Sequence, residues 1–254
     1  MALWLRPEET SSYKLSKVIN YGGRSIVYKG VVNGERVIIK KTKSNREIEF
    51  LCKLRNVSGV VHYKSYFFDD QYVYTVLEKI RHTIDLYDYI TKCNGYLSEA
   101  LTKTILKQLI GILMECRQKG ILHNDIKETN ILIDPLSKKI TLIDFDAAEV
   151  WGDHDIYDGY LGTWQYSCPE WLARKEYSAD DMTSWSLGIM MYSMICGHLP
   201  FDSPGQIIYN DLPDNARFVM SKKAYAFLSQ CLDKNNANRI KLIDMLTHEW
   251  FIDP

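Results

Sequence analysis

The stretch ILHNDIKETNILID, residues 121–134, followed by TLIDFD at residues 141–146, decides the fold of this chain. Two short apolar runs, residues 131–133 and 140–143, flank a segment that begins with Pro135. Apolar runs of this length around a turn signal predict two short buried strands joined by a tight connection. We therefore expect a hairpin here, with the polar residues of the stretch at the ends of its strands.

The polar side chains of this hairpin are two carboxylates, an ammonium and a carboxamide: Asp125, Asp144, Lys127 and Asn130. Hard cations such as Mg²⁺ take oxygen ligands, and a polyphosphate needs cations around it, so the set suits a magnesium polyphosphate. For each residue alone an ordinary polar loop, in which aspartates only cap and turn the backbone, remains open. The ordered set favours the phosphate site.

These residues also carry a resemblance. HNDIKETN, from His123 to Asn130, and DFD, from Asp144 to Asp146, resemble the catalytic-loop and metal-binding motifs of eukaryotic protein kinases. The run from Gly120 to Phe201 is most similar to the Pim-type serine/threonine kinases. The resemblance implies an α+β, bilobal protein-kinase fold, with a small five-stranded antiparallel N-lobe that has one short helix and a mainly helical C-lobe. The expected single domain covers residues 1–254, with the N-lobe at 1–78, the hinge at 79–82 and the C-lobe at 83–254.

Composition limits the other classes. A chain of 254 residues with 46% hydrophobic residues can fill one large core or two lobes. A formal net charge of -1 gives no global field for nucleic acid or membranes, so we expect neither partner. We also expect a monomer. The six cysteines show no metal-ligand spacing, and no apolar run reaches the ~20 residues of a membrane span. We expect free thiols and a cytoplasmic or nuclear protein.

The first strands surround a glycine pair. Residues 13–40 alternate apolar and polar positions around Gly22-Gly23 and Asn33-Gly34, which predicts a strand, a tight loop, a strand, a hairpin turn and a third strand. Residues 20–28 stand where a kinase carries its glycine-rich phosphate loop. Only Gly22 of the three glycines is in register there, so an ordinary hairpin is the alternative.

The third strand holds the candidate phosphate-binding lysine. VIIK, ending at Lys40, resembles the kinase motif whose lysine holds the α and β phosphates of ATP. Ile38 lies on the same strand face, where the family has alanine, and should narrow the adenine site. A solvated strand end is the alternative for Lys40. The resemblance implies a hinge from Leu77 to Ile80 and these nucleotide-binding residues: Gly22, Gly23, Val27, Ile38, Lys40, Leu77, Glu78 and Leu132.

A short helix follows. Ser44 to Glu47 form a capping-box pattern that opens a predicted helix over residues 47–54. Glu47 matches the kinase helix glutamate that pairs with Lys40, and helix capping competes for the same side chain.

The remaining pattern predicts two further strands, then helices. Beyond Thr83 the apolar period changes to 3.6, and Ser98 is the predicted N-cap of a long helix that ends near Gly120. The first of these two strands comprises residues 60–61 and 63–68, and the second comprises residues 72–77. The other predicted helices lie at 85–91, 185–194, 224–232 and 240–246.

The resemblance assigns the catalytic roles. Asp125 would orient the substrate hydroxyl and accept its proton, and Lys127 would lie near the γ-phosphate. Asn130 and Asp144 would hold Mg²⁺. Thr163 matches the residue that braces Asp125 and Lys127.

Two departures bear on regulation, and one motif is structural. Asn124 replaces the arginine that captures a phosphorylated activation loop, so we expect no control by phosphorylation of that loop. Asp146 replaces a glycine, which adds negative charge beside the metal site. Glu170 of the CPE motif is expected to form a buried ion pair with Arg239.

The first hypothesis for function is an ATP-dependent protein serine/threonine kinase of the compact kind that large DNA viruses carry. A pseudokinase that binds nucleotide or serves as a scaffold is the alternative, and a small-molecule kinase is a third. The resemblance places Asp85, Asp88 and Glu128 where Pim-type kinases present acids to arginines of the substrate, which leads to the further hypothesis of a basic protein substrate. Four more acids either attract such a substrate or form a solvated acidic surface: Glu149, Asp153, Asp155 and Asp158.

Overall fold

The computed structural model describes residues 13–152 and 156–252, so Asp153 and Asp155 lie outside the described residues. The chain divides into two compact units. One unit comprises Met1–Asn56 with Val60–His82, and the other comprises Val57–Gly59 with Thr83–Pro254. Each unit is described by itself.

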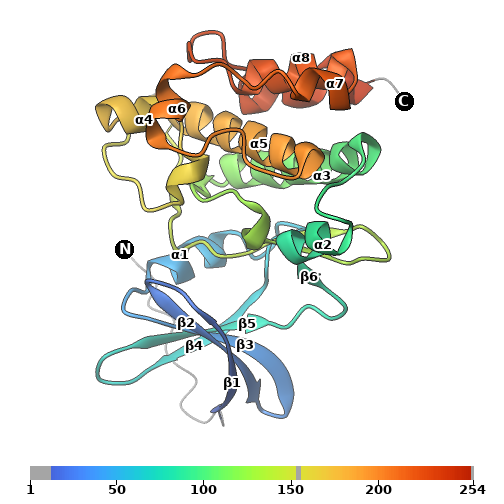
Figure 1. Ribbon diagram of the computed structural model, residues 1–254. Coiled ribbons are helices and arrows are strands. Elements are labelled where there is room, and N and C mark those ends of the chain that lie inside the picture. The colour runs from blue at the N-terminus through green and yellow to red at the C-terminus, as the bar shows by residue number, and fades with distance from the viewer. Residues whose placement is uncertain (1–12, 153–155, 253–254) are drawn as a thin grey trace. The chain divides into compact units, whose positions relative to one another are not determined.

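A five-stranded antiparallel sheet forms the first unit, in the order β1-β2-β3-β5-β4 (Figure 1). The predicted turn at Asn33-Gly34 is confirmed: both residues have positive φ, 48° and 84°, and Val32 pairs with Glu35. Positive φ at both central positions is the geometry that favours Asn-Gly in tight hairpins. The strands are β1 (Tyr13–Tyr21), β2 (Ser25–Val32), β3 (Glu35–Thr42), β4 (Tyr63–Phe68) and β5 (Val73–Glu78).

One face of this sheet carries an apolar core. Val37, Ile39 and Val76 are almost fully buried, as the alternating pattern of β3 requires. Phe67 stacks on Tyr13 and on Tyr74, with ring centroids 4.0 and 4.6 Å apart. Phe67 and Tyr74 are cross-strand partners, and ring stacking between such partners stabilises the sheet beyond simple burial.

The helix of the first unit is α1 (Arg46–Lys53), one residue earlier than predicted. The predicted capping box is wrong: Asn45 is the N-cap without a side-chain bond, and Ser44 Oγ accepts from the amide of Arg46 at 3.2 Å. The physical reason lies in Glu47, whose carboxylate is engaged by Lys40 and does not turn back to the helix start.

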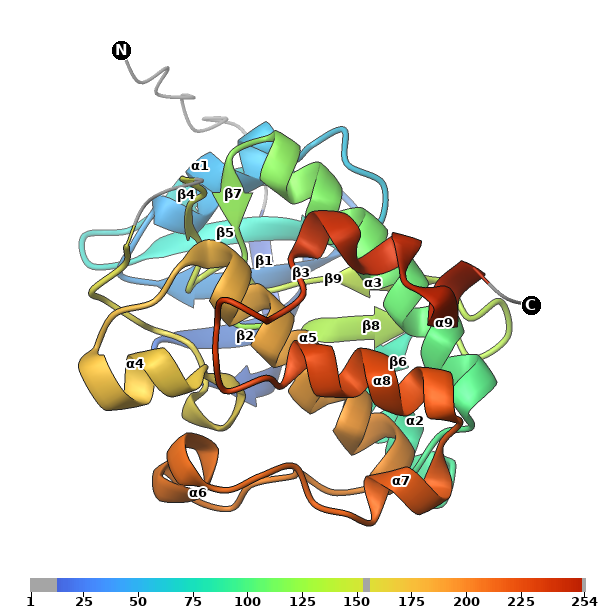
Figure 2. The same cartoon turned by 90° about the horizontal axis from the view of Figure 1, so that it is seen from above.

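The second unit is mainly helical, and Figure 2 shows α3, α5 and α8 packed next to one another. The predicted N-cap of α3 is confirmed, since Ser98 accepts from the amide of Leu101. Its longer helices are α2 (Leu86–Lys92), α3 (Glu99–Gln118), α5 (Ala179–Cys196) and α8 (Lys222–Cys231).

The predicted hairpin is confirmed within this unit. Strand β8 (Ile131–Ile133) pairs antiparallel with β9 (Ile140–Leu142), and β6 (Ile84–Asp85) adds a third strand beside β8. The ends of both apolar strands are buried, so the polar residues that precede them are held by a fixed backbone.

The start of α5 differs from the prediction. The helix begins at Ala179, six residues before Trp185, and Ser178 caps it by accepting from the amide of Asp181. Because α5 is buried on nearly all sides, it has no amphipathic stripe to mark its length. The predicted helix over 240–246 is a 3₁₀ helix, η3 (Leu242–Thr247). Unpredicted short helices are α4 (Pro169–Arg174), α6 (Pro204–Tyr209), α7 (Ala216–Val219) and α9 (Glu249–Ile252).

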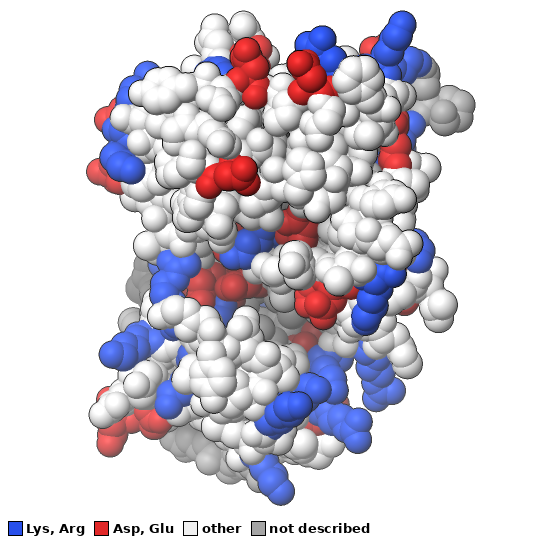
Figure 3. All heavy atoms as spheres, in the orientation of Figure 1, with Lys and Arg blue, Asp and Glu red and all other residues white. Residues whose placement is uncertain are grey.

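The surface and the thiols agree with the composition. Basic and acidic side chains are interspersed on the face of each unit drawn in Figure 3. All six cysteines are free. Among the described residues no helix is long and apolar enough to cross a membrane.

Candidate active site

The catalytic loop is anchored at both ends by the second unit's own strands. It leaves β7 (Ile121–Leu122), which pairs with β10 (Glu149–Val150), and it enters β8 through a 3₁₀ turn, η1 (Glu128–Asn130). Asn130 itself is tied into the hairpin, since its carbonyl accepts from the amide of Ile143 at 2.9 Å. The loop between these anchors therefore has little freedom to move its side chains.

Asp125 lies at the centre of this loop and its carboxylate has three donors. Lys127 Nζ and Asn130 Nδ2 donate to Oδ2 at 2.7 and 3.0 Å, and the backbone amide of Thr163 donates to Oδ1 at 2.8 Å. Lys127 Nζ also donates to Thr163 Oγ1 at 2.7 Å. The structure thus brings together Asp125, Lys127, Asn130 and Thr163, and the predicted bracing contacts of Thr163 are present.

His123 supports the loop from behind. Its Nδ1 accepts from the amide of Asp125 at 3.3 Å, which leaves Nε2 to carry the proton that bonds the Ile143 carbonyl at 3.0 Å. Complete burial lowers the pKa of His123, so the neutral imidazole that these two bonds require is the stable form. Its ring meets Phe145 edge to face, with centroids 4.7 Å apart.

Asn130 and Asp144 have the donor chemistry that Mg²⁺ requires. The amide nitrogen of Asn130 faces Asp125, so its carbonyl oxygen is on the opposite side of the planar group. Asp144 contributes a carboxylate from a left-handed backbone conformation, φ 66°, that aspartate tolerates better than most residues. An amide oxygen and a carboxylate are hard ligands, and they fit a magnesium ion.

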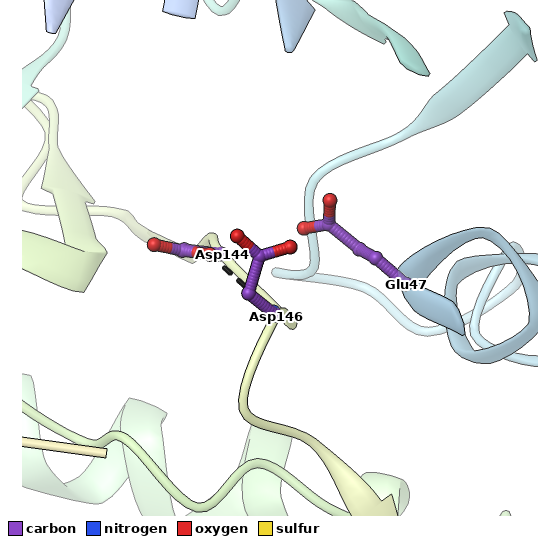
Figure 4. A group of neighbouring side chains, drawn as sticks. All are labelled: Glu47, Asp144 and Asp146. Atoms are coloured by element: carbon purple, nitrogen blue, oxygen red, sulfur yellow. Dashed lines mark hydrogen bonds between the residues drawn. The ribbon is translucent and has the colours of Figure 1, made fainter. Parts of the chain in front are cut away.

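Asp146 lies two residues from Asp144, and its backbone amide donates to Asp144 Oδ1 at 3.4 Å (Figure 4). The acidic side chain therefore occupies the glycine position without breaking the local turn. It adds a second carboxylate to the neighbourhood of Asp144.

Lys40 and Glu47 form the predicted ion pair within the first unit. Lys40 Nζ lies 2.9 Å from Glu47 Oε1, and both side chains are about as buried as any in the sheet. Figure 4 draws Glu47 where it projects from α1. Burial makes this pair costly to break, so the lysine is not the solvated strand end that the sequence left open.

The other nucleotide candidates fall into three places. Gly22 and Gly23 form the turn between β1 and β2, where the amide of Gly22 donates to the carbonyl of Ser25 at 2.9 Å. On the sheet, Val27 is the cross-strand partner of Lys40, and Ile38 is the partner of Leu77. Glu78 ends β5, and Leu132 lies on β8 in the second unit.

Glu128 differs from its prediction as a substrate-facing acid. It is buried, and Tyr166 Oη donates a short hydrogen bond to its Oε2. Burial raises the pKa of Glu128, with the bond from Tyr166 acting in the opposite direction. Of the predicted acids, Asp85 caps α2 by accepting from the amide of Asp88, whereas Asp88 and Asp158 are exposed.

Two tyrosines with roles at this site were missed by the sequence analysis. Tyr166 holds Glu128, and Tyr177 accepts a hydrogen bond from Asn124 Nδ2 at 2.8 Å. No sequence pattern around either tyrosine predicts these hydrogen bonds. The one available signal was Asn124 itself, because asparagine is enriched at positive φ and Asn124 has φ 65°.

A five-stranded unit with a buried lysine and glutamate, and a helical unit whose aspartate is held by lysine, asparagine and threonine, define the class of the protein kinases.

Comparison with known proteins agrees. The family profile described as "Protein kinase domain" matches residues 13–251. "Serine/threonine-protein kinase pim-2" of Danio rerio is 32% identical over 95% of this chain and 85% of its own length. "Serine/threonine-protein kinase prk-2" of Caenorhabditis elegans is 29% identical over 94% of this chain and 58% of its own length. "Serine/threonine-protein kinase 1" of African swine fever virus, strain Badajoz 1971 Vero-adapted, is 29% identical over 91% of this chain and 77% of its own length. The chain belongs to the protein kinase family, among its Pim-like serine/threonine members.

Proposed function

We propose that this protein transfers the γ-phosphate of ATP to serine and threonine hydroxyls of protein substrates. The observation that carries the proposal is the arrangement around Asp125, whose carboxylate is oriented by Lys127, Asn130 and Thr163. Phosphoryl transfer asks the protein mainly for such positioning and for neutralisation of charge.

Each residue of the loop has a distinct task in this proposal. Asp125 orients the substrate hydroxyl and accepts its proton, because it is the carboxylate that the loop holds in place. Lys127, bonded to both Asp125 and Thr163, offers its ammonium group to the transferred phosphate. Thr163 keeps the segment that follows the activation loop in register with Asp125.

The nucleotide and its metal would be bound by the predicted residues. Lys40, held by Glu47, binds the α and β phosphates. Asn130 and Asp144 would hold Mg²⁺, which would supply positive charge that neutralises the phosphates. The adenine would contact Val27, Ile38, Leu77, Glu78 and Leu132, and Gly22 and Gly23 would lie over the phosphates.

A pseudokinase is the second candidate, and the departures at Ile38 and Asp146 favour it. Ile38 on β3 is larger than the alanine of the family, and Asp146 adds a carboxylate beside Asp144. Both changes weaken nucleotide binding unless the nucleotide site adjusts to them. The ordered donors around Asp125 favour the active enzyme, since a scaffold has no chemical need for them.

The deciding experiment measures ³²P transfer from ATP with Mg²⁺ to a pool of basic and neutral peptides. Asp125→Asn and Asp144→Asn should each abolish turnover, whereas the matched change at the exposed Asp70, Asp70→Asn, should leave most of it. A folded wild type that binds ATP yet transfers no phosphate to any peptide would favour the pseudokinase.

The same pool tests the substrate class. We propose a basic protein substrate, for which the exposed Asp88 and Asp158 are the supporting acids among the described residues. Exchanging the arginines of the best peptide for glutamate should raise its KM at least tenfold. Equal phosphorylation of both peptides would remove the proposal.

A further inference from the structure

Asn124 stands in the catalytic loop between His123 and Asp125, and it is bonded to a residue far along the chain. Its side chain is buried, and its Nδ2 donates to Tyr177 Oη at 2.8 Å. The tyrosine hydroxyl in turn donates its only proton to the carbonyl of Gly159 at 2.9 Å. One hydroxyl therefore joins the catalytic loop to the segment that ends the activation loop.

The direction of these two bonds is fixed by chemistry. Burial raises the pKa of Tyr177 above its usual range, so the phenol keeps its proton at every physiological pH. A protonated phenol that donates to Gly159 must accept from its other partner, and the amide group of Asn124 is a donor. Both bonds are therefore neutral and independent of any added charge.

The backbone strengthens the same junction. Tyr157 and Tyr177 exchange two backbone hydrogen bonds, 2.9 and 3.1 Å, as an isolated antiparallel bridge. The hydroxyl of Tyr157 donates to the carbonyl of Val150 and accepts from the amide of Gly152. The described part of the activation loop is thus fastened on both sides of residues 153–155.

Aromatic rings complete the junction. Tyr177 stacks on Tyr157, with centroids 5.3 Å apart, and meets Tyr160 and Trp171 edge to face at 5.9 Å each. Aromatic pairs of this geometry stabilise a structure beyond the burial of their surface. We call the set Asn124, Tyr157, Tyr160, Trp171 and Tyr177 the tyrosine clasp.

The clasp leads directly to the reacting carboxylate. The hydroxyl of Tyr160 donates to the carbonyl of Thr163 at 3.1 Å, and the amide of Thr163 donates to Asp125 Oδ1 at 2.8 Å. Asn124 is the neighbour of Asp125 in the chain. Movement of Tyr177 would therefore disturb Asp125 by two routes. One runs through Asn124 in the catalytic loop, and the other runs through Tyr160 and Thr163.

The sequence supplies no phosphate acceptor of the serine or threonine type to do this task. Between Asp146 and Leu161 the only hydroxyl side chains are Tyr157 and Tyr160. Both rings belong to the clasp, and both hydroxyls are already bonded. A loop organised by neutral bonds and rings needs no arginine at position 124.

We propose that Tyr177 is a positioning residue for the transfer reaction: through Asn124 and Gly159 it holds the activation segment in the working arrangement without phosphorylation. This inference rests on the proposed kinase function and adds how the activation segment is held in its active arrangement.

The test removes the hydroxyl and keeps the ring. Tyr177→Phe should lower kcat about tenfold, since it leaves a buried amide donor and a carbonyl unpaired, while the KM for ATP stays within about twofold. Tyr209→Phe is the matched control, because that tyrosine is 83% exposed. Wild-type protein treated with phosphatase should keep full turnover.

A second variant approaches the bond from its other end. Asn124→Gly keeps the positive φ and removes the donor, and its loss should not add to that of Tyr177→Phe in the double variant. Hydrogen exchange of the Thr163 amide should be faster in both single variants than in wild type. Either variant alone carries the test if the other fails to fold.

Unchanged kcat in Tyr177→Phe, fully additive losses, or inactivation by phosphatase would each overturn the clasp. A wild type without turnover would instead contradict the proposed function, and hydrogen exchange at Thr163 would still decide whether the clasp holds the segment. The two failures are therefore distinguishable.

Discussion

Gly162 is a residue at which the segment after the activation loop lies tightly against the catalytic loop. A Cβ atom at this position would lie 2.4 Å from the carbonyl oxygen of Asn124 and 2.5 Å from the ring of Tyr160. Gly162→Ala should therefore push Thr163 away from Asp125 and lower kcat at least tenfold, since such overlap with backbone requires the loop to shift. Steady-state kinetics with a saturating peptide measures the effect.

The neighbouring glycine provides the control. A Cβ atom at Gly159 meets nothing within 4 Å, and the carbonyl that Tyr177 uses would remain. Gly159→Ala should keep near wild-type kcat. If both alanine variants behaved alike, close approach at Gly162 would not be the reason for glycine there.

At the scale of single residues, contacts between residues close in the sequence were predictable, and contacts between residues far apart in the sequence were not. The pair of Lys40 and Glu47 was implied by the resemblance of two nearby motifs, seven positions apart, to those of protein kinases. Asn124 and Tyr177 are 53 positions apart, and nothing local to either residue encodes their bond. The burial of Glu128 was missed for the same reason, because its partner Tyr166 arrives from another segment.

Among the elements, the ion pair of Glu170 with Arg239 joins the start of α4 to the segment before η3. Arg239 donates to both carboxylate oxygens at 3.0 and 2.7 Å, and both side chains are buried. Glu170→Gln removes one charge and leaves the buried guanidinium with only its longer ion pair to Asp181, at 3.7 Å. This loss should cost about 3–5 kcal/mol of unfolding free energy. Urea denaturation at pH 7 measures it, with Glu176→Gln on the exposed surface as control.

The same pair sets a pH dependence. Burial by itself raises the pKa of Glu170, but the hydrogen bond and charge of Arg239 outweigh it and lower the pKa below 4.5. As pH falls below about 4.5, the unfolded state binds a proton that the folded state still lacks, so stability decreases with falling pH. Between pH 5 and pH 3, the part of the decrease in unfolding free energy that Glu170 causes should disappear in Glu170→Gln. An identical slope in both proteins would assign it to other carboxylates.

The start of α3 was predicted well, and the start of the buried helix α5 was not. Ser98 marked the beginning of α3 because a capping side chain and an amphipathic stripe coincide there. The central helix α5 lacks such a stripe, so its first six residues were assigned to no helix. The short helices α6 and α7 are too brief for periodicity to detect.

For the whole molecule, sequence order and spatial grouping differ at one place. Residues 57–59 interrupt the first unit in the sequence but belong to the second, where the carbonyl of Gly59 accepts from the amide of Leu142 at 2.7 Å. Apolar periodicity predicts elements but carries no information about such a crossing. The strand content of one unit and the helix content of the other were predictable because the period changes near Thr83.

The proposed ATP ligands come from both units, so nucleotide should stabilise the chain only when both contribute. ATP at 100 times its Kd should add about 2.7 kcal/mol and raise Tm by roughly 5–10 °C. Lys40→Met and Asp144→Asn should each shrink this shift, and so should replacing Mg²⁺ with EDTA, whereas Lys43→Met at an exposed position should keep it. The shift upon ATP addition is compared within each variant, because loss of Lys40 also leaves Glu47 buried without its cation. A full shift in Asp144→Asn would mean that nucleotide binds without that carboxylate, and the magnesium assignment would be wrong.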